Sequence, residues 1–456
     1  MKKTSFIFAA LLMAAAPLFA QEQDYDTDIN QYGQTMHVTP LRAEQQDGIL
    51  VLQNKSIGYK FWFDVRVQGD AAVYWGQDKD FNPIGNGASM RRTRFAVKVL
   101  LDKNWYGELD TDWTSGVCEI KDAYIKYIGV PNLFIQAGNF KENFSIQRNT
   151  TSRYLQFMER PMVVTLAPSR HMGINATYDL GYLWSSLGVF GPEVKGPEEM
   201  AAMEDNNKDF GHDEGLSFTG KLVGRPLYKS AVSSLHIGAA ASYRQPKASS
   251  TDGYAVARYS SRNSTNINRK KYLDTDDMKG MDHELAYTFE LAGHHRGLRY
   301  EGAYLARTAH FNKKVNDIAP QTAWGWYVQA GYLLFGGQQN YDASGAKYTR
   351  VNRGGKCGDI ELCARYEYCN FNTANYYGGS AEAYTLGLNF YLSNNVKFVL
   401  NYQYNNNDRF ANGKGKLFIG HDASGKPTKD YTKIVEAPGK GGVDYNMLAF
   451  RFEVAF

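Results

Sequence analysis

Apolar and polar residues alternate with a period of two along much of the chain. At residues 384–390 one face is apolar and the other polar, and the pattern returns at 396–404 after a turn. Such alternation predicts β-strands, because successive side chains of a strand point to opposite faces of its sheet. Sixteen strands are predicted, at 57–75, 89–101, 105–113, 118–128, 132–140, 171–179, 183–190, 215–225, 232–243, 283–292, 297–309, 324–335, 358–368, 382–392, 395–404 and 443–456.

The predicted connections between these strands alternate in length. Short turns fall at 102–104, 129–131, 179–182 and 393–395, and long connections fall near 141–170, 191–214, 244–282 and 405–442. A membrane-spanning barrel has this organisation, with short periplasmic turns and longer external loops. The connection at 336–357 breaks the alternation. Its place in the strand order predicts a short periplasmic turn, but it is long. Either one strand is miscounted or this turn is elaborated.

Composition separates a membrane barrel from other all-β folds. The chain holds 32 Tyr, 25 Phe and 7 Trp beside 44 Gly and only 13 Pro. The outer face of a membrane barrel needs an apolar band with aromatic girdles, whereas its lumen is polar. We therefore expect an all-β transmembrane antiparallel barrel of about sixteen strands. A secreted β-sandwich or sugar-binding solenoid is the alternative.

The first twenty residues predict export from the cytoplasm. Lys2 and Lys3 precede an apolar run that ends at Ala20, which is the pattern of a secretory signal peptide. No later run of eighteen or more apolar residues predicts a membrane-spanning helix. We expect a signal peptide at 1–20, an N-terminal periplasmic extension at 21–55 and the barrel at 56–456.

The last predicted strand is amphipathic and ends with an aromatic residue. Leu448, Phe450 and Phe452 share one face, Arg451 lies on the other, and the chain stops at Phe456. This ending resembles the assembly signal of bacterial outer-membrane barrels. It predicts an outer-membrane location, contact with outer-membrane lipid, and recognition of Phe456 by the barrel-assembly machinery.

Charge and cysteine content exclude some classes of partner. The 51 Lys and Arg residues nearly balance 47 Asp and Glu residues, so the chain has no basic field that predicts nucleic-acid binding. Cys363 and Cys369 lie in one predicted strand, about 20 Å apart at about 3.3 Å per residue, which is too far for a disulfide. We expect these two residues, together with Cys118 and Cys357, to be free thiols.

Two neighbouring strands carry opposite charges on one face. Strand 89–101 places Arg92, Arg94 and Lys98 opposite an apolar face, and lipid exposure of such charges costs about 2–4 kcal/mol each near the midplane. The cations should therefore point into the lumen. Two interpretations remain open, a salt-bridge network within the wall or a track for anions. The matching acidic face of strand 105–113 consists of Glu108, Asp110 and Asp112.

The long connection at 141–170 is both basic and apolar. Its cations outnumber Glu142 and Glu159, and Phe, Met and Ile residues interrupt the charged positions. Folded into the lumen, it would narrow a pore and present guanidinium groups, whose planar fork matches phosphate oxygens. A solvated basic surface loop is the alternative. Its cations are Lys141, Arg148, Arg153, Arg160 and Arg170.

Several short motifs occur in a characteristic order. They are Ser-Met-Arg-Arg-Thr-Arg-Phe at 89–95, Lys-Asp-Ala-Tyr at 121–124, Gly-Asn-Phe-Lys at 138–141, Phe-Met-Glu-Arg at 157–160 and Ala-Pro-Ser-Arg at 167–170. Together they resemble the phosphate-selective porin O and P family, most strongly over residues 89–178. The resemblance implies a sixteen-stranded, usually trimeric barrel, whose third external loop folds into the lumen beside an arginine-lined anion path.

The resemblance implies which residues line this path, and the facing argument adds Arg94 and Lys98. Arg91 and Lys121 fall on faces that strand alternation assigns to lipid, so they are expected at strand ends or beside a bulge. The residues that the resemblance implies are Arg91, Arg92, Lys121, Lys141, Arg153, Arg160 and Arg170.

The predicted function is passive diffusion of small inorganic anions, such as phosphate or polyphosphate-like solutes, through a homotrimeric channel. The sequence departs from the family at Gln147-Arg148, where acidic residues are common, and it lacks a dense lysine cluster. A general or carbohydrate-selective porin is therefore an alternative.

An outer-membrane hydrolase is a further alternative. Its candidate residues show no catalytic or metal-ligand spacing, so we predict no catalytic residue, metal or cofactor. These candidates are Ser169, His171, His283, Glu284, His294 and His295.

Overall fold

The computed structural model describes residues 26–77, 81, 84–192, 215–246, 254–267, 270–408, 417–436 and 441–456. The chain divides into two compact units, residues 1–42 and residues 43–456. The first unit contains a hairpin of β1 (Asp26–Ile29) and β2 (Thr35–Val38). The expected signal peptide and most of the expected long connection at 191–214 lie outside the described residues.

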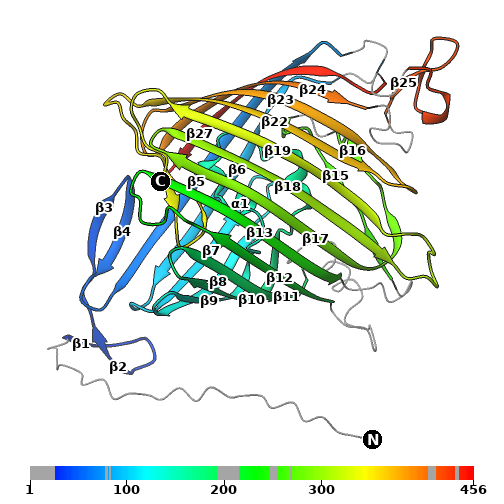
Figure 1. Cartoon of the computed structure of the whole chain (residues 1–456). Coiled ribbons are helices and arrows are strands. Elements are labelled where there is room, and N and C mark those ends of the chain that lie inside the picture. Colours follow the sequence, from blue (N-terminus) through cyan, green and yellow to red (C-terminus); the bar gives the residue numbers. More distant parts are fainter. Residues whose placement is uncertain are drawn as a thin grey trace, which may run out of the picture. The chain divides into compact units, whose positions relative to one another are not determined.

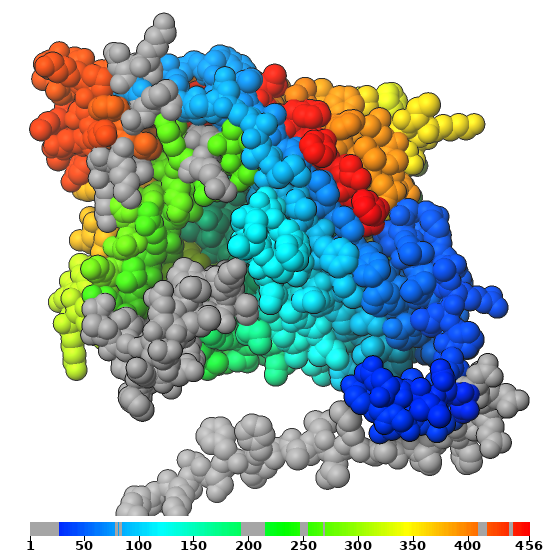
Figure 2. Space-filling model, turned by 180° about the vertical axis from the view of Figure 1, so that it is seen from behind, coloured from blue at the N-terminus to red at the C-terminus, as the bar shows by residue number. Residues whose placement is uncertain are grey.

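Sixteen long antiparallel strands form a closed barrel in the described part of the second unit (Figure 1). All sixteen predicted strands are present, and the fold class is confirmed. The barrel closes where the last strand pairs with the first, as Figure 2 shows for the red and blue strands. The strands are β5 (Tyr59–Trp75), β6 (Gly87–Leu100), β7 (Trp105–Asp112), β8 (Glu119–Val130), β9 (Leu133–Lys141), β10 (Arg170–Asp179), β11 (Leu183–Phe190), β12 (Gly215–Gly224), β13 (Ser233–Pro246), β17 (Met278–His295), β18 (Leu298–Phe311), β19 (Gln321–Leu333), β22 (Asp359–Asn372), β23 (Tyr377–Tyr391), β24 (Val396–Asn407) and β27 (Tyr445–Ala455).

Apolar side chains face outward and charged side chains face inward, which is the reverse of their arrangement in a soluble protein. The outward-facing Phe95 and Phe450 are 41% and 42% exposed, whereas the inward-facing Arg92 and Arg451 are only 4% and 2% exposed. This arrangement fits a barrel whose outer surface contacts lipid and whose lumen is polar. Each strand alternates between these two environments, so the period-two pattern predicted the strands correctly.

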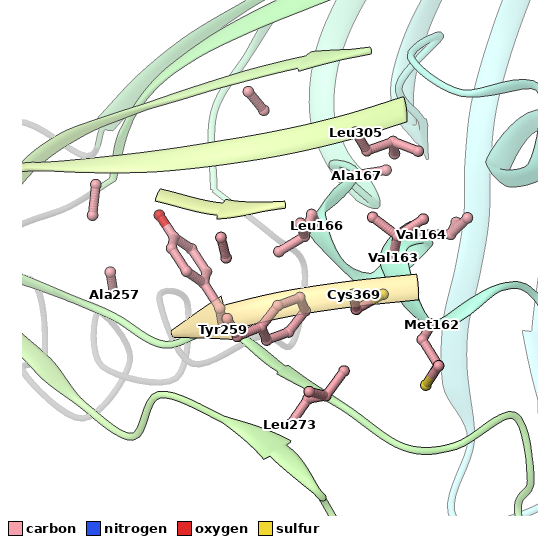
Figure 3. Packing of buried hydrophobic residues seen from close by; sticks show 14 of the residues in the cluster. Met162, Val163, Val164, Leu166, Ala167, Ala257, Tyr259, Leu273, Leu305 and Cys369 are labelled. Atoms are coloured by element: carbon pink, nitrogen blue, oxygen red, sulfur yellow. The ribbon is translucent and has the colours of Figure 1, made fainter. Parts of the chain in front are cut away.

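The connection between β9 and β10 folds into the lumen, as the sequence predicted. We call residues 142–169 the constriction loop. The loop contains α1 (Ile146–Asn149) and the 3₁₀ turns η1 (Ser152–Tyr154) and η2 (Met162–Leu166). Its apolar residues pack against inward-facing residues of the wall, and Figure 3 shows the η2 residues beside Leu305 and Cys369.

Short strands complete the described structure. β3 (Arg42–Gln46) and β4 (Ile49–Asn54) extend the sheet beside β5, so the barrel sheet continues into the predicted N-terminal extension. The long connection at 336–357 is an elaborated turn. The other elements are β14 (Ala255–Ala257), β15 (Ser260–Ser261), β16 (Leu273–Asp274), β20 (Tyr341–Asp342), β21 (Lys347–Tyr348), β25 (Gly420–His421), β26 (Pro427–Thr428) and η3 (Tyr431–Lys433).

Two further observations concern the whole described chain. None of its helices is both long enough and apolar enough to cross a membrane. The four cysteines are free; Cys363 and Cys369 are buried, and Cys118 and Cys357 are exposed.

Candidate ion pathway

A cavity of about 420 Å³ lies between the constriction loop and the wall formed by β5 to β10. Eight lysine or arginine side chains and five carboxylates line it, an excess of three positive charges. The cations are Arg66, Arg94, Lys98, Lys126, Lys141, Arg153, Arg170 and Lys347, and the carboxylates are Asp64, Glu108, Asp110, Asp122 and Asp342.

The two oppositely charged strands form ion pairs across the wall. Arg94 of β6 lies 3.0 Å from Asp112 and 3.6 Å from Asp110, both in β7. Lys98 lies 2.7 Å from Asp64 and 3.8 Å from Glu108. The charged face therefore forms a salt-bridge network, one of the two open interpretations, and all of these side chains except Asp112 also line the cavity.

The constriction loop and the strand that follows it join this network. Arg170 forms two hydrogen bonds with Asp122 of β8, at 3.0 and 2.7 Å, in the parallel geometry that suits guanidinium and carboxylate. Arg153, inside the loop, pairs with Asp64 of β5. Arg153 and Lys98 thus share one carboxylate.

β-Bulges explain why Arg91 and Lys121 break the strand alternation. In the β5–β6 ladder Gln68 is opposite Arg92 and Gly69 is opposite Met90, so Arg91 is an extra residue. In the β7–β8 ladder the extra residue is Lys121, which lies 2.6 Å from Glu119. An extra residue changes the local direction of the side chains of a strand. Arg91 therefore points toward the constriction loop, where it binds Glu159.

Glu159 of the constriction loop binds arginines from two strands. Its carboxylate lies 2.5 Å from Arg91, 2.9 Å from Arg451 and 3.9 Å from Arg92. Burial raises the pKa of this carboxyl, but the surrounding guanidinium charges dominate and hold the pKa well below its ordinary value. Glu159 therefore neutralises part of the arginine charge that the sequence assigns to the anion path.

Two residues predicted for the path form no ion pair with any described carboxylate. Lys141 lines the cavity from the end of β9. Arg160 donates to the carbonyl oxygens of Gln147 and Thr150, at 2.6 and 2.7 Å, and retains its full charge. Burial and the positive charge of Arg148 lower the pKa of Arg160 to about 9, so it stays cationic at neutral pH.

A second cavity, of about 320 Å³, lies between the constriction loop and residues 260–266, with Lys271 also in its lining. Five cations and one carboxylate line it, so positive charge dominates here more strongly than in the first cavity. Arg160 lines this cavity, together with Arg91 and Glu159. The remaining charged residues are Arg148, Arg262 and Lys271.

Sequence reasoning missed several residues of the site. Arg66 and Asp64 alternate with apolar residues in β5, and the facing argument used for strand 89–101 would have found both. Arg451 lies beside Glu453 on the polar face of the last strand, and no sequence signal connects it to Glu159. Lys347 lies in the elaborated turn, whose inward course a strand pattern does not reveal.

The candidate hydrolase residues lie at separate places in the described chain, with Ser169 immediately before β10 and His171 near its start. His283 and Glu284 lie near one end of β17, whereas His294 and His295 lie at the other end. Carboxylate oxygens of Glu108, Asp110 and Asp122 lie within 4.8 Å of one another. Each of these three carboxylates already lies near a lysine or arginine.

Comparison with known proteins agrees with this geometry. The sequence model of the family "Phosphate-selective porin O and P" matches residues 61–421. The chain belongs to this family. The porin is 23% identical over 393 residues to Porin O of Pseudomonas aeruginosa, covering 78% of this chain and 85% of that protein.

Two further similarities extend the comparison. An uncharacterized protein of Caulobacter vibrioides is 26% identical to the porin over 325 residues, which cover 70% of this chain and 63% of that protein. The fold is similar to that of OmpT, an outer-membrane protein of Vibrio cholerae, with a TM-score of 0.50 and 10% identity, covering 88% of this chain and all of that one. The family and the fold place the porin in the outer membrane.

Proposed function

We propose that this porin is a passive channel that prefers small anions, with phosphate and related oxyanions as its main solutes. The observation that carries the proposal is the charge of the two cavities beside the constriction loop. Positive side chains outnumber carboxylates by three in one cavity and by four in the other. An excess of fixed positive charge in a narrow lumen raises the local anion concentration.

The chemistry of the unpaired cations supports an oxyanion. Lys141 contributes an ammonium donor and Arg160 a guanidinium group, and both types of donor bind phosphate oxygens. The carboxylates of the first cavity lie near lysine or arginine side chains, so they repel an anion less than free carboxylates would. The family description, phosphate-selective porin, supports the same solute class.

A trimer is the proposed assembly. The similar OmpT structure is described as a trimer form, and the two chains share the closed barrel. Small inorganic anions, outer-membrane lipid and the barrel-assembly machinery are the proposed partners. Recognition by that machinery would involve Phe456, whose backbone pairs with Val65 of β5.

Substitution of Lys141 tests the proposal. A unit charge about 4 Å from an anion contributes about 1 kcal/mol in water, so Lys141→Gln is expected to weaken phosphate block of the chloride current about fivefold. Lys141→Arg keeps the charge and should retain most of the block. Single-channel recording in planar bilayers measures both variants. If phosphate blocks the chloride current equally in Lys141→Gln and wild type, Lys141 does not bind the passing anion.

A general porin is the second candidate, and the wall network favours it. The paired charges of Arg94, Lys98 and their carboxylates create a field across the lumen. Such a field orients polar solutes without choosing the sign of an ion. The two functions differ in ion selectivity, which a salt gradient measures.

A further inference from the structure

The connection between β19 and β22 enters the lumen from the end of the barrel that carries the short turns. We call residues 334–358 the inner segment. Its Ala346 and Tyr348 are 0% and 1% exposed. Tyr341 and Tyr348 pack with Ala292 of β17 and with Ile146 of the constriction loop. The inner segment and the constriction loop, entering from opposite ends of the barrel, therefore meet inside it.

Glu361 of β22 binds both inserted segments through one oxygen atom. Its Oε1 accepts a hydrogen bond from Gln156 of the constriction loop at 2.7 Å. The same atom accepts another from Gln339 of the inner segment at 2.8 Å. Glu361 is fully buried, so its charge depends on these donors and on Asn389 and Tyr391, which bind Oε2.

Arg299 of β18 makes a second shared contact. Its guanidinium donates to the carbonyl oxygen of Tyr154 in the constriction loop at 2.9 Å. The centre of the same guanidinium lies 3.7 Å from the ring centroid of Tyr348 in the inner segment, within cation–π range. Tyr348 in turn donates its hydroxyl to the carbonyl oxygen of Gly293 at 2.7 Å.

Glu290 of β17 makes the third shared contact. Its Oε2 accepts the backbone N–H of Ile146 at 2.8 Å. Its Oε1 lies 2.9 Å from one ring nitrogen of His236, and the other ring nitrogen lies 2.7 Å from the hydroxyl of Tyr341. Glu290 and His236 are both buried.

We infer that the inner segment positions the constriction loop, with Glu361, Arg299 and Glu290 as the positioning residues. Each is a buried charged group that contacts the loop directly; Glu361 and Arg299 also contact the inner segment directly, and Glu290 reaches it through His236. If a side chain of the inner segment no longer donates its hydrogen bond, the buried charged group of the wall loses a partner. That wall side chain is then freer to move, and the constriction loop that it binds becomes less ordered. The order of the loop then depends on a segment that enters from the periplasmic side. This inference needs only the loop in the lumen and is independent of which ions pass.

Two adjacent glutamines provide a matched test. Gln339 donates to the shared Glu361, whereas Gln338 donates to the carbonyl oxygen of Ala231 in an exposed turn. Hydrogen exchange measured by mass spectrometry on the detergent-folded porin reports the opening of loop amides. Gln339→Ala is expected to speed exchange at residues 146–160 by about twofold to tenfold, the effect of one lost buried hydrogen bond. Gln338→Ala should leave these residues unchanged.

A functional readout separates positioning from general loosening of the barrel. Gln339→Ala should increase the open-channel current noise in planar bilayers, while exchange in the barrel strands stays at the wild-type rate. Tyr348→Ala, which removes the ring beside Arg299, should act in the same direction if it folds. Wild-type exchange at 146–160 in Gln339→Ala would overturn the inference. An equal increase in Gln338→Ala would overturn it as well.

Discussion

At the scale of single residues, Glu159 joins the constriction loop to the barrel wall. It binds Arg91 from the bulge of β6 and Arg451 from β27, and Arg451 also forms two 2.7 Å hydrogen bonds with Asp70. In this cluster the arginine charges stabilise the contact between the constriction loop and the barrel wall. Lys141 and Arg160, by contrast, form no ion pair with a described carboxylate and line the two cavities.

Replacing Glu159 should destabilise the folded barrel. Glu159→Gln removes the carboxylate nearest to Arg91 and Arg92, while Arg451 keeps Asp70, and the loss of a buried charged partner costs about 1–3 kcal/mol. Glu119→Gln is the matched control, because its pair with Lys121 is more exposed and an exposed pair contributes about 0–1 kcal/mol. Urea unfolding of the porin in lipid vesicles measures both. Equal midpoints for the two variants would contradict the anchoring role.

Period-two alternation predicted side-chain facing well where the strands are regular. Arg94 and Lys98 face the acidic side chains of β7, as their spacing required. Arg91 and Lys121 were harder to place, because a bulge adds one residue to a strand and reverses the alternation beyond it. The family resemblance implied that both line the path, and the ladder registers show that each is the extra residue of a bulge, as the sequence allowed.

At the scale of elements, the two sides of the lumen differ in character. Strands β5 to β8 present charged side chains around the first cavity, whereas β13 to β23 combine buried charges such as Glu290 and Arg299 with many buried alanines, which contact the apolar side of the constriction loop. The loop lies against the alanine side because small side chains leave room for Met162 and Leu166. The first cavity lies on the charged side. The sequence pattern did not reveal this division, because alanine occurs on both the lipid face and the lumen face of these strands.

Enlarging an inward alanine should displace the loop. Ala323 of β19 is fully buried in the cluster that contains η2, whereas Ala330 of the same strand points outward and is exposed. Ala323→Leu overfills the cluster, at a cost of about 1–3 kcal/mol, and should change the single-channel conductance. Ala330→Leu adds apolar surface on the lipid side and should leave conductance unchanged. If both variants conduct as wild type, the packing of the loop does not set the pore.

The length of the inner segment was predictable as unusual, but its course was not. Connections between strands alternate between short and long, and this one is long where a short one is expected. Its course into the lumen depends on buried contacts such as Trp184 to the carbonyl oxygen of Ser344 and Arg225 to that of Ala343. These partners are more than a hundred residues away in sequence, and no local pattern reports them.

Replacing the tip of the inner segment should widen the pore. Exchange of residues 341–348 for a short Gly-Ser turn removes Lys347 and Tyr348 from the lining of the first cavity. Single-channel conductance should rise because less of the lumen is filled. An unchanged conductance in a folded variant would show that the ions do not pass this segment.

At the scale of the whole molecule, the barrel follows from one constraint. Sixteen strands close into a ring that leaves no exposed sheet edge in the membrane, and every strand then has one face to lipid and one to the lumen. The fold was therefore predictable from alternation. The site was predictable only in part, because it depends on where two long connections turn inside the ring.

In the two cavities beside the constriction loop, positive side chains outnumber carboxylates. The reversal potential of the reconstituted porin in a potassium chloride gradient tests most directly whether this charge selects anions. An anion-selective potential, reduced in Lys141→Gln and retained in Lys141→Arg, is the predicted result. A cation-selective potential, or one with no ion preference in the wild-type porin, would show that this charge does not select anions.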